Sequence, residues 1–211
     1  MNLARKIDYT LLKPQATEKD IVALCHEAQE HKFAAVCVNP IYVKTAAKLL
    51  HGTGIGVAAV VGFPFGATFT EVKIQEVFMI KAHGGKEADM VINLGWAKSG
   101  NWQDVEQEIV RVVEAAHSCG LQIKVIIETC LLSEDEKKQA AEIVKRSGAD
   151  YIKTSTGFAE GGATVEDVRK LKAWVGEDVK VKAAGGIRTR DFALELVEAG
   201  AERLGTSVIL G

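Results

Sequence analysis

The sequence predicts an α/β fold, a (β/α)8 barrel formed as one domain over residues 1–211. Eight short apolar runs rich in β-branched residues alternate with segments of helical periodicity. Gly84, Gly120, Gly148 and Gly200 each follow a predicted helix and precede the next strand. Repeated strand–helix units make neighbouring strands parallel, and eight of them favour a closed barrel over the alternative, an open doubly wound sheet.

The first half of the chain supplies four strands, which we expect at residues 7–12, 34–39, 56–61 and 89–94. Thr17 and Asp20 form a capping box that opens a helix to about His31, and Pro40 is placed to start the next helix. Further helices are expected over about 70–83 and 101–118. The glycines at 52, 54 and 56 precede a strand, so they do not form a dinucleotide-binding fingerprint.

The second half supplies strands at 123–129, around Lys153, around Lys182 and at 203–207. Ser133 and Glu136 form a capping box for a helix that ends at Gly148. Two further helices are expected from residue 164 to about 174 and from residue 189 to about 200. Four residues follow position 207, so we expect the final helix of the barrel to be short or absent.

The composition is that of an ordinary soluble protein, with 47% hydrophobic and 26% charged residues and a net charge of −2. This balance gives no support for nucleic-acid binding. The longest apolar run, residues 55–67, is short and interrupted by glycine, so we expect no membrane association and a cytoplasmic protein. Scattered histidines and cysteines without a C-x-x-C pair favour free thiols and no metal site.

Polar and charged residues alternate with aliphatic residues along the strands and collect on one face. That face carries Asp8, Thr10, Cys37, Asn39, Asp89, Asn93, Lys124, Glu128, Lys153, Ser155, Lys180 and Lys182. Barrel interiors are mainly branched aliphatics, so a charged interior indicates a functional site. The alternatives are structural ion pairs, or a register shifted by one residue so that the charges face outward. We expect Lys180 at the barrel bottom, paired with an acid.

Lys153 and Lys182 lie 29 positions apart in successive strands. Two positive charges about 6 Å apart repel by roughly 3 kcal/mol at an effective dielectric near 20, which is about two pKa units. With modest desolvation, this repulsion brings one amine close to neutral pH. Lys153 is then a nucleophile able to form a Schiff base, and Asp89 is the carboxylate placed to move protons.

Three predicted strands end in glycine-rich turns, at 154–157, 185–186 and 205–207. Most glycine pairs only form tight turns. Phosphate sites of barrels, however, commonly form after strands seven and eight, where backbone N–H groups are free. We therefore expect a phosphate site at these turns.

The chain resembles the deoxyribose-phosphate aldolase family of class I aldolases over nearly its whole length. The resemblance is carried by IDYTLLKP, AVCVNP, VVGFPFG, DMVINLGWAKSG, KVIIET, YIKTSTGF, VKAAGGIRT and RLGTS. It implies cleavage of 2-deoxy-D-ribose 5-phosphate to D-glyceraldehyde 3-phosphate and acetaldehyde, without metal or organic cofactor, in a homodimer or homotetramer. Two departures are Gly85-Lys86, where the family more often has Ala-Asp, and Val208, where a second serine is common.

The resemblance also assigns roles to single residues. Lys153 would form the Schiff base, Lys182 would lower the pKa of Lys153, and Asp89 would take the C3 hydroxyl proton. The implied substrate-binding residues are Asp8, Thr10, Cys37, Gly157, Gly185, Gly186 and Ser207. Two alternatives remain: a phosphate-binding barrel isomerase or epimerase in which Lys153 is never covalent, and a non-catalytic barrel that binds sugar phosphates.

Overall fold

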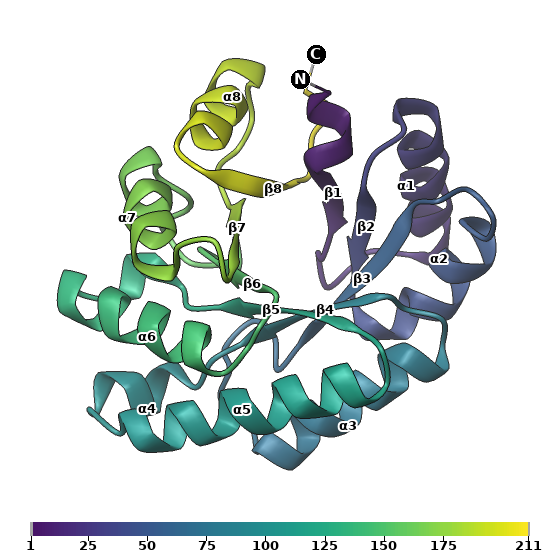
Figure 1. The fold of residues 1–211 in the computed structure, drawn as a ribbon. Coiled ribbons are helices and arrows are strands. Elements are labelled where there is room, and N and C mark those ends of the chain that lie inside the picture. The colour runs from purple at the N-terminus through teal and green to yellow at the C-terminus, as the bar shows by residue number, and fades with distance from the viewer. Residues whose placement is uncertain (1, 211) are drawn as a thin grey trace.

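The computed structural model describes residues 2–210 and is a closed barrel of eight parallel strands in chain order, surrounded by helices (Figure 1). This confirms the predicted fold. The strands are β1 (Ile7–Leu11), β2 (Ala35–Val38), β3 (Gly56–Val61), β4 (Glu87–Val91), β5 (Gln122–Ile126), β6 (Tyr151–Lys153), β7 (Lys180–Ala184) and β8 (Ala201–Thr206). The helices are α1 (Glu18–His31), α2 (Val43–Leu49), α3 (Thr70–Ala82), α4 (Leu94–Lys98), α5 (Trp102–Ser118), α6 (Glu134–Arg146), α7 (Val165–Val175) and α8 (Arg190–Glu198), with 3₁₀ turns η1 (Leu3–Lys6), η2 (Pro40–Tyr42) and η3 (Thr129–Leu131).

Side-chain caps fix where several helices begin. The two predicted capping boxes are both present, Thr17 with Asp20 before α1 and Ser133 with Glu136 before α6. Each satisfies two backbone N–H groups that have no partner within the helix. The predicted starts of α1 and α6 are therefore confirmed.

The ends of two strands differ from the prediction. β4 begins at Glu87, two residues before the predicted start, and Leu94 opens the short helix α4 instead of ending the strand. The Asn93 side chain caps α4 by accepting a hydrogen bond from the Trp96 N–H. β5 ends at Ile126, because Glu128 adopts a left-handed backbone with φ +52° that no strand can continue.

The barrel interior has an apolar part and a charged part. Beside β2 and β3, Leu12, Cys37, Ala58 and Val60 form a small buried cluster. The outward strand residues and the apolar faces of the helices form a separate, much larger core. The helices thus supply most of the hydrophobic burial. The interior faces of the strands outside the small apolar cluster carry the charged side chains.

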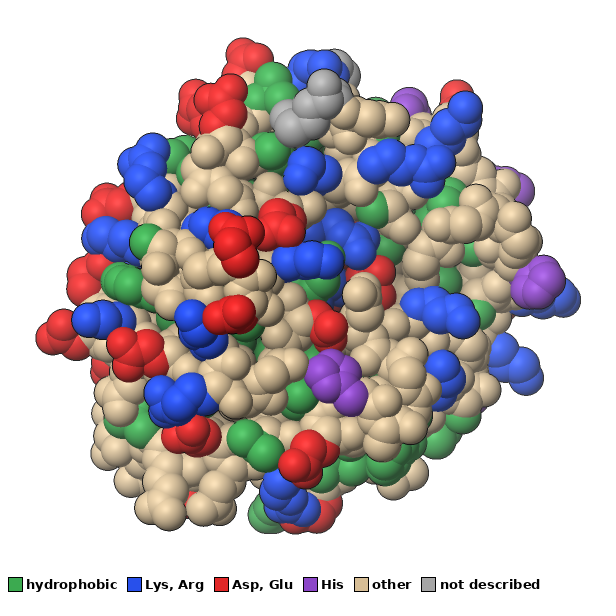
Figure 2. Space-filling view, viewed as in Figure 1, with side chains coloured by type: hydrophobic (Ala, Val, Ile, Leu, Met, Phe, Trp, Pro, Cys, Tyr) green, Lys and Arg blue, Asp and Glu red, His purple; other side chains and the backbone are tan. Residues whose placement is uncertain are grey.

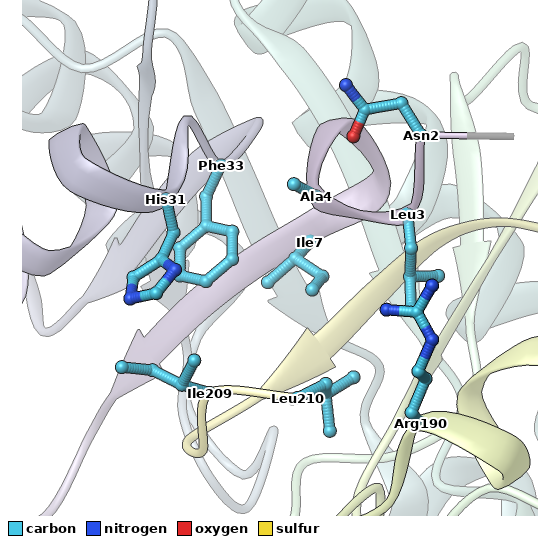
Figure 3. Close-up of a pocket in the computed structure, with 9 residues that line it drawn as sticks. All are labelled: Asn2, Leu3, Ala4, Ile7, His31, Phe33, Arg190, Ile209 and Leu210. Carbon is cyan, nitrogen blue, oxygen red and sulfur yellow. The ribbon is translucent and has the colours of Figure 1, made fainter.

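No helix follows β8 within residues 2–210. The outer side of β1 and β8 is instead covered by η1 and by residues 209–210, which surround a cavity of about 450 Å³ between the ends of α1 and α8 (Figure 3). Leu3, Ile7 and Phe33 line this cavity together with His31 and Arg190. It contains none of the site residues predicted from the sequence.

On the face of the molecule in Figure 2, acidic and basic side chains are mixed over the left half, whereas the right half carries mainly basic side chains and histidines. Exposed ion pairs on the surface of the molecule include Arg146–Glu106 and Lys170–Glu166. Within residues 2–210, the helices are too short or too polar to cross a membrane.

Candidate active site

Seven ionisable side chains from six strands meet inside the barrel, each less than a tenth exposed to solvent. They are Asp8, Glu87, Asp89, Lys124, Lys153, Lys182 and Arg203. In a parallel ladder, residues paired in register point to the same face, and Lys153 is paired with Lys182. The strand alternation therefore places both lysines inside the barrel, as expected from the sequence.

Asp89 is the centre of the cluster because three lysines donate to its carboxylate. Its Oδ2 accepts hydrogen bonds from Lys153 Nζ at 2.8 Å and from Lys182 Nζ at 2.7 Å. Its Oδ1 accepts from Lys124 Nζ at 2.8 Å. The two predicted catalytic amines thus share one oxygen atom and lie within two hydrogen-bond lengths of each other.

Two further carboxylates complete the pairing of the cations. Asp8 accepts from Lys182 Nζ at 2.5 Å and from Arg203 at 2.7 Å. Glu87 accepts from the same guanidinium at 2.9 Å and forms an ion pair with Lys124. Each buried charge therefore has at least one partner of opposite sign, which is the condition for burying charges in a protein.

Asp89 and Asp8 are held in their ionised form. Burial alone would raise the pKa of Asp89, but the coulombic attraction of Lys124, Lys153 and Lys182 outweighs it and holds that pKa well below the usual value. Asp8 follows the same pattern: burial opposes ionisation, and Lys182 is its largest compensating charge, so its pKa is also lowered.

Lys153 differs from Lys124 and Lys182, the other two lysines of the cluster. Burial lowers the pKa of Lys153, Asp89 opposes this, and Lys182 adds to the lowering, with a net shift below the usual value. For Lys182, burial is outweighed by Asp8 and Asp89, and its pKa is raised. The sequence argument attributed most of the lowering of the Lys153 pKa to repulsion from Lys182. In the structure, burial is the larger cause of this lowering.

Lys153 opens onto a cavity of about 340 Å³ at the carboxyl ends of the strands. The cavity brings together six of the predicted residues: Thr10, Lys153, Gly157, Gly185, Gly186 and Ser207. Gly157, Gly185 and Gly186 all have positive φ, at +84°, +87° and +77°. A side chain at these positions would strain the backbone, so glycine is required for these turns.

The other four predicted residues lie deeper in the barrel. Asp8, Asp89, Lys182 and Cys37 are fully buried and do not line this cavity. The Cys37 Sγ lies 4.0 Å from Asp89 Oδ2, and burial raises the pKa of the thiol to about 11. Cys37 is therefore a neutral thiol beside the charged cluster.

Several site residues escaped the sequence analysis. Glu87 and Arg203 belong to the charged cluster, and Lys13 and Arg188 add positive charge to the cavity wall. Glu87 precedes Asp89 by two positions, so strand alternation would have identified it had the strand been started earlier. Arg203 is paired in register with Lys182, a relation that requires the β7–β8 alignment.

The expectation that Lys180 is paired with an acid is wrong. Its side chain is exposed at the start of β7, and no carboxylate lies within ion-pair distance of it among residues 2–210. Its Nζ instead lies 5.5 Å from the centre of the Tyr151 ring. Because water solvates the ammonium group there, the lysine needs no acidic partner.

The loop after β6 is fixed by Glu128. Both carboxylate oxygens of this buried residue accept from the Thr156 N–H, at 3.1 and 3.3 Å, and one also accepts from the Thr156 hydroxyl. The Thr156 oxygen in turn accepts from the Phe158 N–H, and the Phe158 ring packs edge-on against Phe63. This chain of contacts shapes the cavity wall next to Gly157.

Comparison with known proteins adds the family. The model of the DeoC/LacD family of aldolases matches residues 4–211. A protein of Desulfitobacterium hafniense named deoxyribose-phosphate aldolase is 73% identical over 207 residues, which are 98% of this chain and 95% of the relative. The solved structure of the aldolase QR15 has a TM-score of 0.93 and 40% identity, covering 98% of this chain and 92% of its own.

A further solved structure is that of a deoxyribose phosphate aldolase from Aeropyrum pernix, described as tetrameric. It has a TM-score of 0.91 and 35% identity, over 97% of this chain and 86% of its own. This chain covers 95%, 92% and 86% of the length of these three relatives.

Proposed function

This chain belongs to the DeoC/LacD family of aldolases, and from this premise we propose that it is a deoxyribose-phosphate aldolase that acts through a Schiff base on Lys153. The reaction is the reversible cleavage of 2-deoxy-D-ribose 5-phosphate to D-glyceraldehyde 3-phosphate and acetaldehyde. One observation carries the proposal: Lys153 is a buried lysine with a lowered pKa whose side chain lines a cavity ringed by glycine turns. A neutral amine in such a cavity can attack an aldehyde.

The first half of the proposed reaction forms the covalent intermediate. The neutral Lys153 Nζ attacks C1 of the open-chain sugar, the carbonyl oxygen takes up protons and leaves as water, and a protonated imine remains. Lys182 supplies and removes protons in these steps, since its ammonium shares Asp89 Oδ2 with Lys153. The positive imine nitrogen then withdraws electrons from the C2–C3 bond.

The second half breaks the carbon–carbon bond. Asp89 accepts the C3 hydroxyl proton through a water molecule, and the C2–C3 bond breaks. Its electron pair forms the C1=C2 double bond of an enamine, and D-glyceraldehyde 3-phosphate leaves. Protonation at C2 and hydrolysis of the imine release acetaldehyde and restore Lys153. The low pKa of Asp89 keeps the carboxylate ionised before the proton is transferred.

We assign the phosphate group to the end of the cavity formed by the glycine turns. Gly157, Gly185, Gly186 and Ser207 would bind its oxygens, and Arg188, exposed at the same end, would add a positive charge. Thr10 also lines the cavity and would contact the sugar hydroxyls. Asp8 and Cys37 support the substrate side from below, Asp8 by holding Lys182.

The proposed reaction uses no cofactor, since the imine itself is the electron sink. We further propose a cytoplasmic location, in keeping with four free cysteines. A homodimer or homotetramer is proposed by analogy with the tetrameric relative from Aeropyrum pernix.

The proposal is tested by incubating the purified protein with 2-deoxy-D-ribose 5-phosphate and measuring both products. Acetaldehyde and D-glyceraldehyde 3-phosphate are expected in equal amounts, and the reverse condensation should proceed with the same protein. An isomerised or epimerised sugar phosphate without acetaldehyde would instead identify an isomerase. Binding without any conversion would identify a non-catalytic barrel.

A further inference from the structure

Six of the seven charged side chains of the cluster inside the barrel form a closed ring in which acids and bases alternate. The order around the ring is Asp8, Lys182, Asp89, Lys124, Glu87, Arg203 and back to Asp8. Every member contacts a partner of opposite sign on each side. With three carboxylates and three cations, the ring is electrically neutral when all its members are ionised.

Lys153 is attached to this ring from outside. Its one ion pair is with Asp89, whose carboxylate already belongs to the ring through Lys124 and Lys182. The buried cluster therefore holds four cations for three carboxylates. Protonated Lys153 is the surplus charge, and the cluster becomes neutral when Lys153 loses its proton.

We propose that Glu87 and Arg203 are positioning residues that set the fraction of Lys153 present as the neutral amine, by fixing the charge of the ring to which Lys153 is attached. This inference rests on the proposed Schiff-base function, which needs that neutral amine. Neither residue lines the cavity around Lys153, so neither is placed to touch the substrate. Their influence would reach Lys153 through the charge of the cluster alone.

The buried side chains of the barrel interior around Lys153 come from all eight strands. They include Asp8 of β1, Cys37 of β2, Ala58 and Val60 of β3, Glu87 and Asp89 of β4, Lys124 of β5, Tyr151 of β6, Lys182 of β7 and Arg203 of β8. Burial keeps the Cys37 thiol neutral, because its pKa is raised to about 11. The ring members are then the charges that decide how readily Lys153 holds a proton.

Removing an acid from the ring and removing a base from it should shift the pKa of Lys153 in opposite directions. Glu87→Gln removes a negative charge and leaves the cluster more positive, so the pKa of Lys153 should fall. Arg203→Gln removes a positive charge, so the pKa of Lys153 should rise. A unit charge about 10 Å away at an effective dielectric near 20 changes a pKa by roughly one unit, which is the shift we expect in each case.

The pKa of Lys153 can be measured without catalysis. The protein is labelled with trace acetic anhydride at a series of pH values, and the acetylation of each lysine is measured by peptide mass spectrometry. Only the neutral amine reacts, so the labelling midpoint of Lys153 reports its pKa. We expect a lower midpoint in Glu87→Gln, a higher one in Arg203→Gln and a nearly unchanged one in Arg203→Lys, which keeps the charge.

The double variant Glu87→Gln/Arg203→Gln removes one charge of each sign and should return the midpoint close to that of the wild type. A purely structural role would shift both single variants in the same direction and would not be cancelled in the double variant. Midpoints that do not move, or that move together, would overturn the proposal. If Arg203→Gln does not fold, Glu87→Gln and Arg203→Lys still give the lowered and the unchanged midpoint.

The labelling is independent of the aldolase assignment. If the midpoints move as expected but no deoxyribose 5-phosphate is cleaved, the control of Lys153 stands and the proposed function fails. If cleavage occurs with unmoved midpoints, the function stands and the role of the ring fails. In the active enzyme, the acidic limb of the kcat/KM pH profile should move in the same direction as the labelling midpoint.

Discussion

The three lysines of the charged cluster differ in the number of carboxylates that contact them, and this difference decides the direction of their pKa shifts. Lys124 contacts Asp8, Glu87 and Asp89, and Lys182 contacts Asp8 and Asp89. Lys153 contacts Asp89 alone. Burial lowers the pKa of all three, but only in Lys153 is the compensation too small, so its pKa is lowered while those of Lys124 and Lys182 are raised.

Replacing Lys153 should remove activity without harming the fold. We expect Lys153→Met to lose deoxyribose 5-phosphate cleavage by roughly a thousandfold or more, since a covalent step cannot be replaced by binding alone. The variant should be no less stable than the wild type, because it removes the surplus buried cation. Assays of cleavage and urea unfolding test both parts. A folded variant with substantial turnover would contradict the covalent role.

Asp89→Asn should behave differently, because it leaves three lysines without their shared carboxylate. Removing one partner of a buried ion pair costs about 3–5 kcal/mol, and we expect a loss of stability in that range. Urea unfolding at pH 7 measures it, with Lys153→Met as the matched control within the same cluster. A loss below about 1 kcal/mol would mean that the cluster rearranges or fills with water when Asp89 is neutralised.

The proposed phosphate site predicts a selective effect. Ser207→Asp places a negative charge at the glycine turns and Arg188→Met removes a positive one, so both should weaken binding of deoxyribose 5-phosphate. Hydrogen bonds to charged groups contribute about 1.5–3 kcal/mol, so KM should rise roughly tenfold or more. Unphosphorylated deoxyribose should be nearly unaffected. Arg190→Met, two positions further on at the other cavity, is the control.

If KM rose equally for both sugars in the Ser207 and Arg188 variants, the phosphate would have to bind elsewhere. The comparison of the two sugars also separates a binding effect from a general disturbance of the barrel. A change in kcat shared by both sugars would indicate such a disturbance.

At the scale of elements, the active-site wall is formed by two loops that contact each other. Ala163, at the end of the loop after β6, donates its N–H to the carbonyls of Ala184 and Gly185. The backbones approach so closely that a Cβ on Gly162 would lie 2.4 Å from the Gly185 carbonyl oxygen. The turns that bear Gly157 and Gly185 are therefore held as one unit.

Glu128 and Thr156 anchor that unit to the segment that follows β5. Thr156→Val removes the hydroxyl that donates to Glu128 and accepts from the Phe158 N–H. An unpaired buried polar group costs about 1–3 kcal/mol, so we expect a stability loss in that range and a rise in KM larger than the change in kcat. Steady-state kinetics and urea unfolding provide the measurement. Thr156→Ser keeps the hydroxyl and should retain both properties; a loss equal to that of Thr156→Val would contradict the role of this hydrogen bond.

The sequence predicted all eight strands, since β-branched runs, capping boxes and glycines between helices and strands are local signals. It missed α4 and misplaced both ends of β4, because Asn93 acts as a helix cap and tertiary contacts extend the strand back to Glu87. The alternation of strand residues brought Lys153, Lys182 and Asp89 to one face. The closed ring could not be foreseen, because Arg203 enters it through the register between β7 and β8.

At the scale of the whole molecule, stability and chemistry come from different layers. The helices and the outer faces of the strands form the large apolar core, whereas the charged interior contributes little net stability, because desolvation offsets the attraction between its charges. The interior therefore makes the protein sensitive to pH. Asp8 and Asp89 stay ionised in this buried position because lysines lie beside them.

Acid should unfold the protein through Asp8 and Asp89. Their pKa values are lower in the folded than in the unfolded state, so their stabilising contribution is complete above the unfolded values and is lost as the pH falls toward the folded ones. Starting from an unfolded pKa near ~3.9, the free energy of unfolding should decline from about pH 5 downward. Urea unfolding at successive pH values tests this, and a weaker decline is expected in Asp89→Asn. A flat profile between about pH 5 and pH 3 would contradict the pairing.

The central claim is that Lys153 forms a covalent imine, and borohydride reduction tests it most directly. The protein is treated with borohydride in the presence of deoxyribose 5-phosphate or acetaldehyde, digested and analysed by peptide mass spectrometry. We predict a reduced adduct on Lys153 and none on Lys124 or Lys182, with loss of activity in proportion to the adduct. An adduct on another lysine, or a protein that binds the sugar phosphate and gives no adduct, would contradict the account.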